Sequence, residues 1–321
     1  MHGPGWIDYD APPAKGEFGD WRTEKPTTFK RSSSSRTIPT CSVVVVSADS
    51  GQSLRECVRR ILASNLQVEL ILVDNGSDDG QPEAVERAFQ NEDRLRVVYN
   101  RANLGFGPAA NRGAAMSRGR FIAIVNPDCL LEPDDLPRMV DIATNDPDTG
   151  VVGAVVCDLE GKPDPASRRR DPTVARVINT MLRRKGRGVA VPGPMPDRPA
   201  PEEAVSGALM LFPRAVYQRV SGFDEGYFLH FEDLDLCRRL RDAGYRVILA
   251  GNLRVQHGKG GSSRHRPVFV SRFKHRGMWR WFRQHDALSR SPVLSGFVWL
   301  AIWAHFVVTA PLLWLRRRRR Q

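Results

Sequence analysis

Three apolar runs in the first 130 residues each end on an aspartate. The runs VVVVSAD, LILVD and FIAIVNPD end at Asp49, Asp74 and Asp128. Short runs rich in Val and Ile are typical of strands that are buried on both faces of a parallel sheet. Because ligands of open α/β sheets bind beyond the carboxyl ends of the strands, the three carboxylates are predicted to line one crevice.

The segments between these runs have the apolar spacing of helices that cover such a sheet. Apolar residues recur on one helical face in Leu54–Leu62, Pro82–Gln90 and Asp134–Ala143. Two further runs, Leu95–Tyr99 and Val151–Val156, raise the predicted strands to five, with connections long enough for parallel crossovers. Residues 40–156 are therefore predicted to form a Rossmann-like nucleotide-binding half.

Composition narrows the class of protein. The chain has 321 residues, 41% of them hydrophobic, which is enough for a substantial core. Its five cysteines are odd in number and scattered without a C-x-x-C pair, so they favour a reducing cytoplasm over a disulfide framework or a zinc cluster. Residues 1–39 are rich in Pro, Gly, Ser and charge, and we expect a disordered tail rather than a secretion signal.

The positive charge gathers in the last part of the chain. From Arg264 onward there are 13 Arg or Lys residues and one acid, which equals the net charge of +12 of the whole chain. Within this part, Val293–Leu315 has no Asp, Glu, Lys or Arg and is long enough to cross a bilayer, where about 20 residues suffice. Residues 266–321 are predicted to be a membrane-associating segment.

Three alternatives are open for this segment. It contacts an anionic membrane as a span or as an in-plane helix, it packs on the protein with solvated arginines, or Arg316–Arg320 bind nucleic acid. The long apolar run and its tryptophans favour the membrane, and no nucleic-acid partner is expected. Basic residues flank the run on both sides, so the charge bias selects no orientation.

Two groups of acids are candidates for chemistry. Asp128 ends the triplet Asn126-Pro127-Asp128 and offers one oxygen ligand for Mg²⁺ or Mn²⁺ beside a diphosphate, although an aspartate in a proline turn has a structural explanation too. Glu232 and Asp233 are predicted to begin a helix that ends at Gly244. Acids there complement the helix dipole, but the same place holds a carboxylate rigidly as a general base requires.

Downstream, the sequence predicts a short strand from Arg246, a turn, and then His257 at the start of a loop rich in Gly and Ser. An imidazole followed by exposed backbone amides suits a metal and a diphosphate, although a lone histidine is more often structural. Gly105–Ala110 matches G-x-G-x-x-A, but the match follows a loop and not a strand, so a dinucleotide site is not predicted.

In order and spacing, these motifs resemble the family 2 glycosyltransferases of GT-A fold, most of all the bacterial rhamnosyltransferases of cell-surface polysaccharide synthesis. The resemblance covers about residues 40–265 and rests on the following stretches: VVVVSAD, VDNGSDDG, NLGFGPAANRG, NPD, and Ser206–Val247 with its FEDLDL. It implies an α/β fold with a mostly parallel central sheet flanked by helices. It also implies a variable loop over 157–205 and an acceptor and catalytic half over 206–265.

The resemblance implies a role for each matching residue. Asp74 would bind the nucleoside, and Ser47, Ala48 and Asp49 would wall the nucleotide pocket, to which the family pattern adds Asn103, Gly105, Asn111 and Asn126. Asp128 would hold Mg²⁺ or Mn²⁺ on the sugar diphosphate, with His257 facing the metal or the diphosphate. Asp233 would be the base, and Glu232 its alternative or an anchor for the acceptor. Asn126 stands where the family has the first acid of D-x-D, and Asp49 where Asn is more common.

The implied reaction is an inverting transfer in one displacement. The donor would be dTDP-rhamnose or a UDP-sugar, and the acceptor a polyprenyl-linked intermediate or a polysaccharide. The basic and apolar tail would hold the enzyme at the cytoplasmic face of the cell membrane, as a peripheral or single-span protein. Two alternatives from other classes are a non-catalytic GT-A relative that serves as a membrane assembly partner, and a nucleic-acid-binding protein that uses the arginine tail.

Overall fold

The computed structural model describes residues 38–184, 186–258 and 267–318, with the side chains of 316–318 left out. The predicted disordered tail up to residue 37, the glycines and serines of the loop after Gly258, and the arginine side chains at the end of the chain lie outside the described residues. Those three predictions stay predictions.

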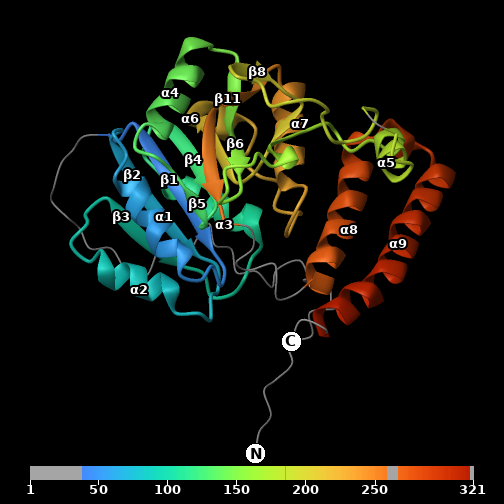
Figure 1. Ribbon diagram of the computed structural model, residues 1–321, viewed down its shortest axis with the longest axis horizontal. Helices are drawn as coiled ribbons and strands as arrows, with labels where there is room; N and C mark the ends of the chain where they lie inside the picture. The colour runs from blue at the N-terminus through green and yellow to red at the C-terminus, as the bar shows by residue number, and fades with distance from the viewer. Residues whose placement is uncertain (1–37, 185, 259–266, 319–321) are drawn as a thin grey trace, which may run out of the picture. The chain divides into compact units, whose positions relative to one another are not determined.

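One mixed sheet organises the described part of the chain (Figure 1). Its strands lie in the order β3-β2-β1-β4-β10-β6-β11-β5, and β8 pairs with β11. Their bounds are β1 Cys41–Ser47, β2 Val68–Asp74, β3 Leu95–Tyr99, β4 Phe121–Val125, β5 Cys129–Leu130, β6 Thr149–Cys157, β8 Pro199–Pro201, β10 Leu209–Pro213 and β11 Arg246–His257. The five runs predicted as strands are β1, β2, β3, β4 and β6.

The first five predicted strands do not form a self-contained half. β3, β2, β1 and β4 pair in parallel, but β10 lies between β4 and β6 and runs antiparallel to both. β10 comes from LMLFP, fully buried except at its last residue, which the sequence analysis did not assign to a strand. β6 and β11 pair in parallel, so the long strands other than β10 share one direction. The predicted mostly parallel sheet is confirmed.

Helices cover both faces of this sheet. α1 (Ser53–Leu62), α2 (Gln81–Ala88) and α4 (Asp135–Asn145) bury apolar residues in the core on one face. On the other face lie α3 (Phe106–Met116), α6 (Arg214–Arg219) and α7 (Glu232–Asp242). The helices predicted from apolar spacing are α1, α2, α4 and α7, each within two residues of its expected start. α7 ends at the predicted place because Gly244 adopts a φ of +86° there.

β11 corrects the predicted turn before His257. The strand runs without interruption for 12 residues, and the expected turn is a shift in its pairing with β6 between Ala250 and Arg254. The irregularity absorbs Gly251 and Asn252 within the strand, as a β-bulge does. His257 is therefore the last residue of a strand and is held by backbone pairing.

Residues 158–203, expected as part of a variable loop, carry several short elements in the described part. These are η1 (Pro165–Ser167), β7 (Arg168–Arg169), α5 (Val174–Met181) and β8. β7 pairs antiparallel with β9 (Ala204–Val205) in a small second sheet. The buried Arg168 fixes the segment through an ion pair to Glu202 and hydrogen bonds to three backbone carbonyls.

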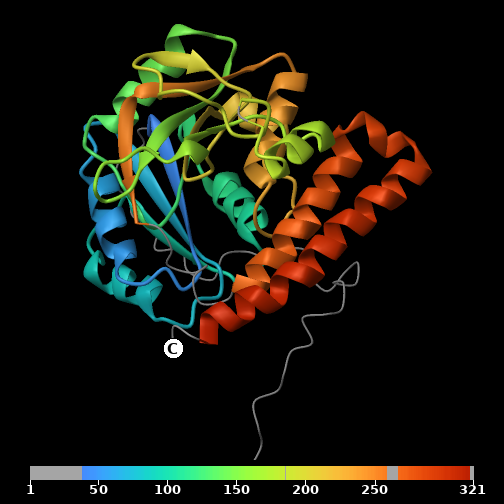
Figure 2. The same cartoon turned by 45° about the vertical axis from the view of Figure 1, so that its right-hand side comes forward.

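Two long helices end the described chain. α8 (Pro267–His285) and α9 (Pro292–Arg318) run antiparallel and are joined by η2 (Ala287–Arg290), as Figures 1 and 2 show. α8 packs on the sheet-and-helix body through Trp281, which belongs to the hydrophobic core. α9 packs along α8 and contains the run that was predicted to meet a membrane.

Candidate active site

A cleft of about 440 Å³ opens where β1 and β4 end and α7 begins. It brings together nine of the residues predicted for the site, namely Ala48, Asp49, Asn103, Gly105, Asn126, Asp128, Glu232, Asp233 and His257. Ser47, Asp74 and Asn111 were predicted too but do not line it. The carboxyl ends of the strands and the start of one helix thus face the same space, as open α/β sheets arrange their ligand sites.

Asp128 and His257 form a close pair on one side of the cleft. Nε2 of His257 lies 3.0 Å from Oδ1 of Asp128 and 3.2 Å from the side-chain nitrogen of Asn126. The backbone explains the closeness, because His257 at the end of β11 pairs with Cys129 in β5, which directly follows Asp128. A carboxylate oxygen and an imidazole nitrogen are thereby fixed side by side.

Glu232 and Asp233 face the cleft from a strained turn. The two residues before them, His230 and Phe231, have φ values of +67° and +72°, which side-chain-bearing residues rarely adopt. Such strain is stable only where the surroundings hold it, and it gathers at functional sites. The turn aims both carboxylates at the cleft from the first turn of α7.

The carboxylate of Asp233 accepts several hydrogen bonds. Its Oδ2 accepts hydrogen bonds from Arg169 and from the backbone N–H of Gly207, and its Oδ1 accepts from the N–H of Leu234 at 2.8 Å. Burial alone would raise the pKa of Asp233, but the charge of Arg169 and these hydrogen bonds outweigh it and lower the pKa below the ordinary value. Asp233 is therefore a charged and weakly basic carboxylate.

Glu232 differs from Asp233 both in its hydrogen bonds and in the direction of its pKa shift. The residue is buried, and its Oε2 has no hydrogen-bond partner among the described residues. Burial, followed by the neighbouring charge of Asp233, raises the pKa of Glu232 to about 8. A carboxylate with a pKa near neutral and an uncommitted oxygen has the properties of a general base.

Asp74 and Ser47 support the cleft from behind. Asp74 is 5% exposed, and burial raises the pKa of its carboxyl. Its Oδ1 accepts from the backbone N–H of Ser77, while Ser47 donates to the hydroxyl of Ser50 at 3.0 Å. These contacts order the turn after β2 and the loop after β1. In this arrangement both residues shape the wall behind the lining residues.

Asn111 does not reach the cleft. Its amide oxygen accepts from the hydroxyl of Tyr217 and the N–H of Phe223, and its nitrogen donates to the carbonyl of Phe223 and to Glu225. The amide thus ties α3 to the chain after α6. Asn111 therefore does not line this cleft, and its role in binding the nucleotide sugar stays a prediction.

Asn75 and Arg169 also line the cleft, and the sequence analysis predicted neither of them as a site residue. Asn75 is 2% exposed and donates to Asn103 and the carbonyl of Gly105, while its own oxygen accepts from Asn100 and Leu104. It therefore shapes the loop over 100–105, and its place in VDNGSDDG beside Asp74 was the available signal. Arg169 reaches Asp233 from the segment expected as a loop, and nothing local in the sequence marks that pairing.

The helix α8 closes part of the cleft. Phe269 and Val270 near its start line the cleft with Phe228. The rings of Phe228 and Phe273 are stacked with centroids 4.3 Å apart, and Phe269 packs edge-on against Phe228. An aromatic wall that belongs partly to the C-terminal helices thus borders the space in front of the carboxylates.

Comparisons with known proteins identify relatives of this arrangement. Residues 42–199 match the profile of a family described as glycosyl transferase family 2. The N-acetylglucosaminyl-diphospho-decaprenol L-rhamnosyltransferase of Mycobacterium tuberculosis is 29% identical over 308 residues, which cover 86% of this chain and 95% of that protein. Two solved structures have similar folds, and they show the fold alone.

The first of these structures is a mannosyltransferase from Pyrobaculum calidifontis in complex with GDP-Man and Mn²⁺. It has a TM-score of 0.57 at 19% identity, over 91% of this chain and 76% of that one. The second, GalNAc-T7 with UDP, GalNAc and Mn²⁺, has a TM-score of 0.57 at 14% identity, over 78% and 57%. With the sheet described above, these similarities confirm the predicted fold class.

Proposed function

We propose that this chain, which belongs to the family 2 glycosyltransferases, transfers rhamnose from a nucleotide diphosphate sugar to a hydroxyl of a lipid-linked acceptor. Glycosyltransferase activity follows from the family and from the rhamnosyltransferase relative, and it disfavours the non-catalytic and nucleic-acid-binding alternatives. One observation supports the finer proposal. Glu232, whose Oε2 has no hydrogen-bond partner among the described residues, lines the same cleft as the Asp128–His257 pair.

The donor would lie against the strand ends. Ala48 and Asp49 line the cleft beside Asn75 and the loop that Asn75 orders, so this wall would take the nucleoside and the sugar. dTDP-rhamnose is the proposed donor, because the relative from Mycobacterium tuberculosis is named as an L-rhamnosyltransferase, and a UDP-sugar is the alternative. Asp74 contributes from behind the wall by fixing the turn at Ser77.

The donor atoms of Asp128 and His257 fit a divalent cation. One oxygen and one imidazole nitrogen stand 3.0 Å apart at the cleft, and no group of three or more acidic, His or Cys ligands occurs in the part of the chain that the structure describes. Two protein ligands suffice where diphosphate oxygens and water complete the coordination, and this mixed pair suits Mn²⁺ better than Mg²⁺. The cation would offset the charge that develops on the leaving diphosphate.

We propose Glu232 as the general base, in preference to Asp233. Glu232 would take the proton of the acceptor hydroxyl as that oxygen attacks the anomeric carbon, so that the configuration inverts in a single displacement. A base works best when its pKa lies near the working pH, which favours the raised pKa of Glu232 over the lowered pKa of Asp233. Asp233 would hold Arg169 at the cleft, where the guanidinium faces the same space.

The membrane supplies the acceptor in this proposal. The relative is named for a decaprenol-linked substrate, and α9 is long and apolar enough to associate with a bilayer. We propose that the enzyme works at the cytoplasmic face of the membrane on a polyprenyl-diphosphate-linked sugar. The aromatic wall of Phe228 and Phe269 would border the acceptor.

The test has two stages. Nucleotide sugars are first screened with Mn²⁺ or Mg²⁺ for a saturable rise in Tm, because a ligand that binds the folded state stabilises it by mass action. The stabilising donor is then incubated with a polyprenyl-diphosphate-linked N-acetylglucosamine, and NMR gives the anomeric configuration of the product. We expect dTDP-rhamnose to stabilise the protein and the product to be inverted. A retained configuration, or transfer to no lipid-linked acceptor from any donor, would contradict the proposal.

A further inference from the structure

The outward face of α9 is a continuous apolar surface. The segment Pro292–Leu315 has 24 residues and a mean hydropathy of 1.8, yet only 11% of it is buried. Ser295 and Ile302 face the protein, whereas the exposed side, at helical spacing, consists of Val293, Phe297, Leu300, Ala304, Val307, Val308, Pro311 and Leu315. Packing on the rest of the chain therefore does not account for this face.

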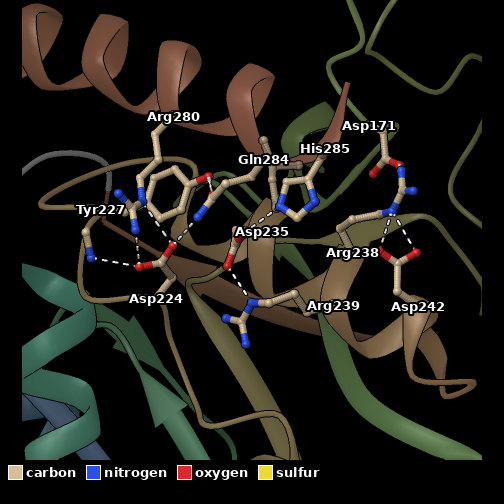
Figure 3. Close-up of polar contacts among 12 residues, drawn as sticks. Asp171, Asp224, Tyr227, Asp235, Arg238, Arg239, Asp242, Arg280, Gln284 and His285 are labelled. Atoms are coloured by element: carbon tan, nitrogen blue, oxygen red, sulfur yellow. Dashed lines mark hydrogen bonds and ion pairs between the residues drawn. The ribbon is translucent and has the colours of Figure 1, made fainter. Parts of the chain in front are cut away.

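The other side of the helical pair is fixed to the catalytic half, as Figure 3 shows. Arg280 of α8 forms two hydrogen bonds with Asp224, at 2.9 and 2.8 Å, and Gln284 donates to the same carboxylate. His285 lies 2.7 Å from Asp235 of α7, which is 1% exposed. These contacts hold α8 on the body that carries the cleft.

α9 is held in turn against α8. Nδ1 of His305 lies 2.9 Å from Nε2 of the buried His275, and their rings are stacked. Ser295 donates to the carbonyl of Ser289, which fixes the turn between the helices. Figures 1 and 2 both show the two helices side by side along their length. The hairpin and the catalytic half are thus connected through α8.

This connection decides how α9 can meet a bilayer. If α9 crossed the membrane, α8 would have to enter it or lose its contacts with α9. α8 carries exposed Lys274, Arg276 and Arg283, and a cation at the centre of a bilayer is costly. The same cations beside an apolar face suit the region of anionic headgroups.

We propose that α9 lies in the plane of an anionic membrane and inserts its outward apolar face among the lipids without crossing. The occupant of this face is the acyl layer just below the headgroups, at a depth of about 5–10 Å. Both ends of α9 stay on the side of the membrane that holds the catalytic half. This inference rests on the proposed membrane association and replaces the choice between span and in-plane helix with one arrangement.

Cysteine labelling tests the arrangement. All five native cysteines are buried, so an introduced exposed cysteine is the main target of a membrane-impermeant maleimide. Ala287→Cys marks the turn before α9, Gln321→Cys marks the chain after it, and Glu160→Cys marks the body that carries the cleft. In sealed membrane vesicles of either orientation we expect the three positions to react together. Reaction of Gln321→Cys from the side opposite to Glu160→Cys would overturn the proposal.

A matched pair of variants tests the lipid contact itself. Leu300 on α9 and Leu159 on the body that carries the cleft are 58% and 62% exposed, so Leu300→Asp and Leu159→Asp make the same change at similar exposure. With phosphatidylglycerol-containing vesicles we expect Leu300→Asp to weaken sedimentation at least about tenfold, since a charge among lipids is costly, and Leu159→Asp to leave it unchanged. Equal binding by both variants would contradict the proposal.

Two further measurements separate the lipid contact from dimer formation and from the proposed function. If the face joins two copies of the chain, the wild-type protein will elute as a dimer that Leu300→Asp dissociates, and vesicles will not compete; that result overturns the lipid assignment. Transfer to a water-soluble acceptor analogue should persist in Leu300→Asp. Absent transfer with intact vesicle binding would contradict the proposed function and leave this inference standing.

Discussion

Two acidic groups face the same cleft, and they are built in different ways. Asp128 follows the end of β4 and is paired with His257, because the backbone of β11 runs beside β5. Glu232 and Asp233 begin α7 after two residues with positive φ, and they are buried beside Arg169. The first group is placed by a sheet edge, and the second by a strained turn.

This difference suits the first group to binding a cation and the second group to proton transfer. A carboxylate at a strand end, with an imidazole beside it, keeps its oxygen available to a cation and its ligands. A pair of adjacent buried carboxylates repel each other, so a cation that binds one of them drives the pKa values apart. Here Arg169 binds Asp233, whose pKa is lowered, and Glu232 takes the raised pKa of about 8.

The largest expected effect is a loss of activity when the second group is changed. We expect Glu232→Gln to lower kcat by about 10²–10⁴-fold, because it removes the proposed base without changing the size of the side chain. In the wild-type enzyme kcat/KM should rise with pH up to about 8, since the base acts only when deprotonated, and the variant should lack this limb. Steady-state transfer assays between pH 6 and 9 measure both effects.

Asp233→Asn is the matched control for that comparison. If Glu232 is the base, the control will lose less kcat and will move the pH limb downward, because the negative charge that raises the pKa of Glu232 is gone. A control that loses as much as Glu232→Gln, together with an unchanged limb in Glu232→Gln, would assign the base to Asp233 as the family pattern implied.

A smaller effect is expected at the strand end. Asp128→Ala should raise the Mn²⁺ concentration required for half-maximal activity and lower kcat/KM by about a hundredfold, since one of two proposed protein ligands is lost. Isothermal titration of the donor with and without Mn²⁺ should show that the metal no longer tightens donor binding. His257→Ala should weaken the same metal dependence, and a metal requirement that survives in both variants would sink the proposed cation site.

The sequence predicts the first group better than the second. The apolar runs mark the aspartates at the ends of the strands, so Asp128 and its crevice follow from local pattern. His257 was predicted as a site residue, but at the start of a loop, because nothing local in the sequence indicates the bulge that continues β11 to His257. The pairing of Asp233 with Arg169 joins residues 64 positions apart in the sequence and depends on a segment without strong periodicity. The contacts of Asn111 could not be predicted for the same reason, because its partners lie more than 100 positions away.

The close approach between the start of α3 and the chain before α7 gives a third prediction. Gly105 at the start of α3 has a φ of +92°, and a Cβ there would lie 2.7 Å from the carbonyl oxygen of Phe228, which leads to the turn before α7. We expect Gly105→Ala to lower the free energy of unfolding by about 2 kcal/mol or more, from backbone strain and this overlap together. Chemical denaturation measures the loss.

Gly51→Ala is the matched control, with a φ of +68° and nothing within 4 Å of the added carbon. It should cost only the strain of the backbone, about 1–2 kcal/mol. If the two variants lose equal stability, the close approach of α3 and Phe228 does not contribute to the stability of the fold.

The last prediction concerns how stability depends on pH. Glu232 has its pKa raised from 4.5 to about 8 in the folded protein, so between those values the folded state holds a proton that the unfolded state has released. Stability should therefore fall as pH rises through this window, by at most about 1.4 kcal/mol per pH unit from this group, and fall no further above it. Asp233 acts in the opposite sense and at lower pH, because its lowered pKa adds stability that is lost only as pH falls below its ordinary value of 3.8.

Denaturation of Glu232→Gln at pH 5 and pH 8.5 should show a smaller decline in stability than the wild type, whereas Glu160→Gln, a change at an exposed position, should keep the wild-type decline. An identical decline in Glu232→Gln would mean that the carboxyl of Glu232 is ionised in the folded protein at neutral pH, and the contrast between the two acidic groups would then lie in geometry alone.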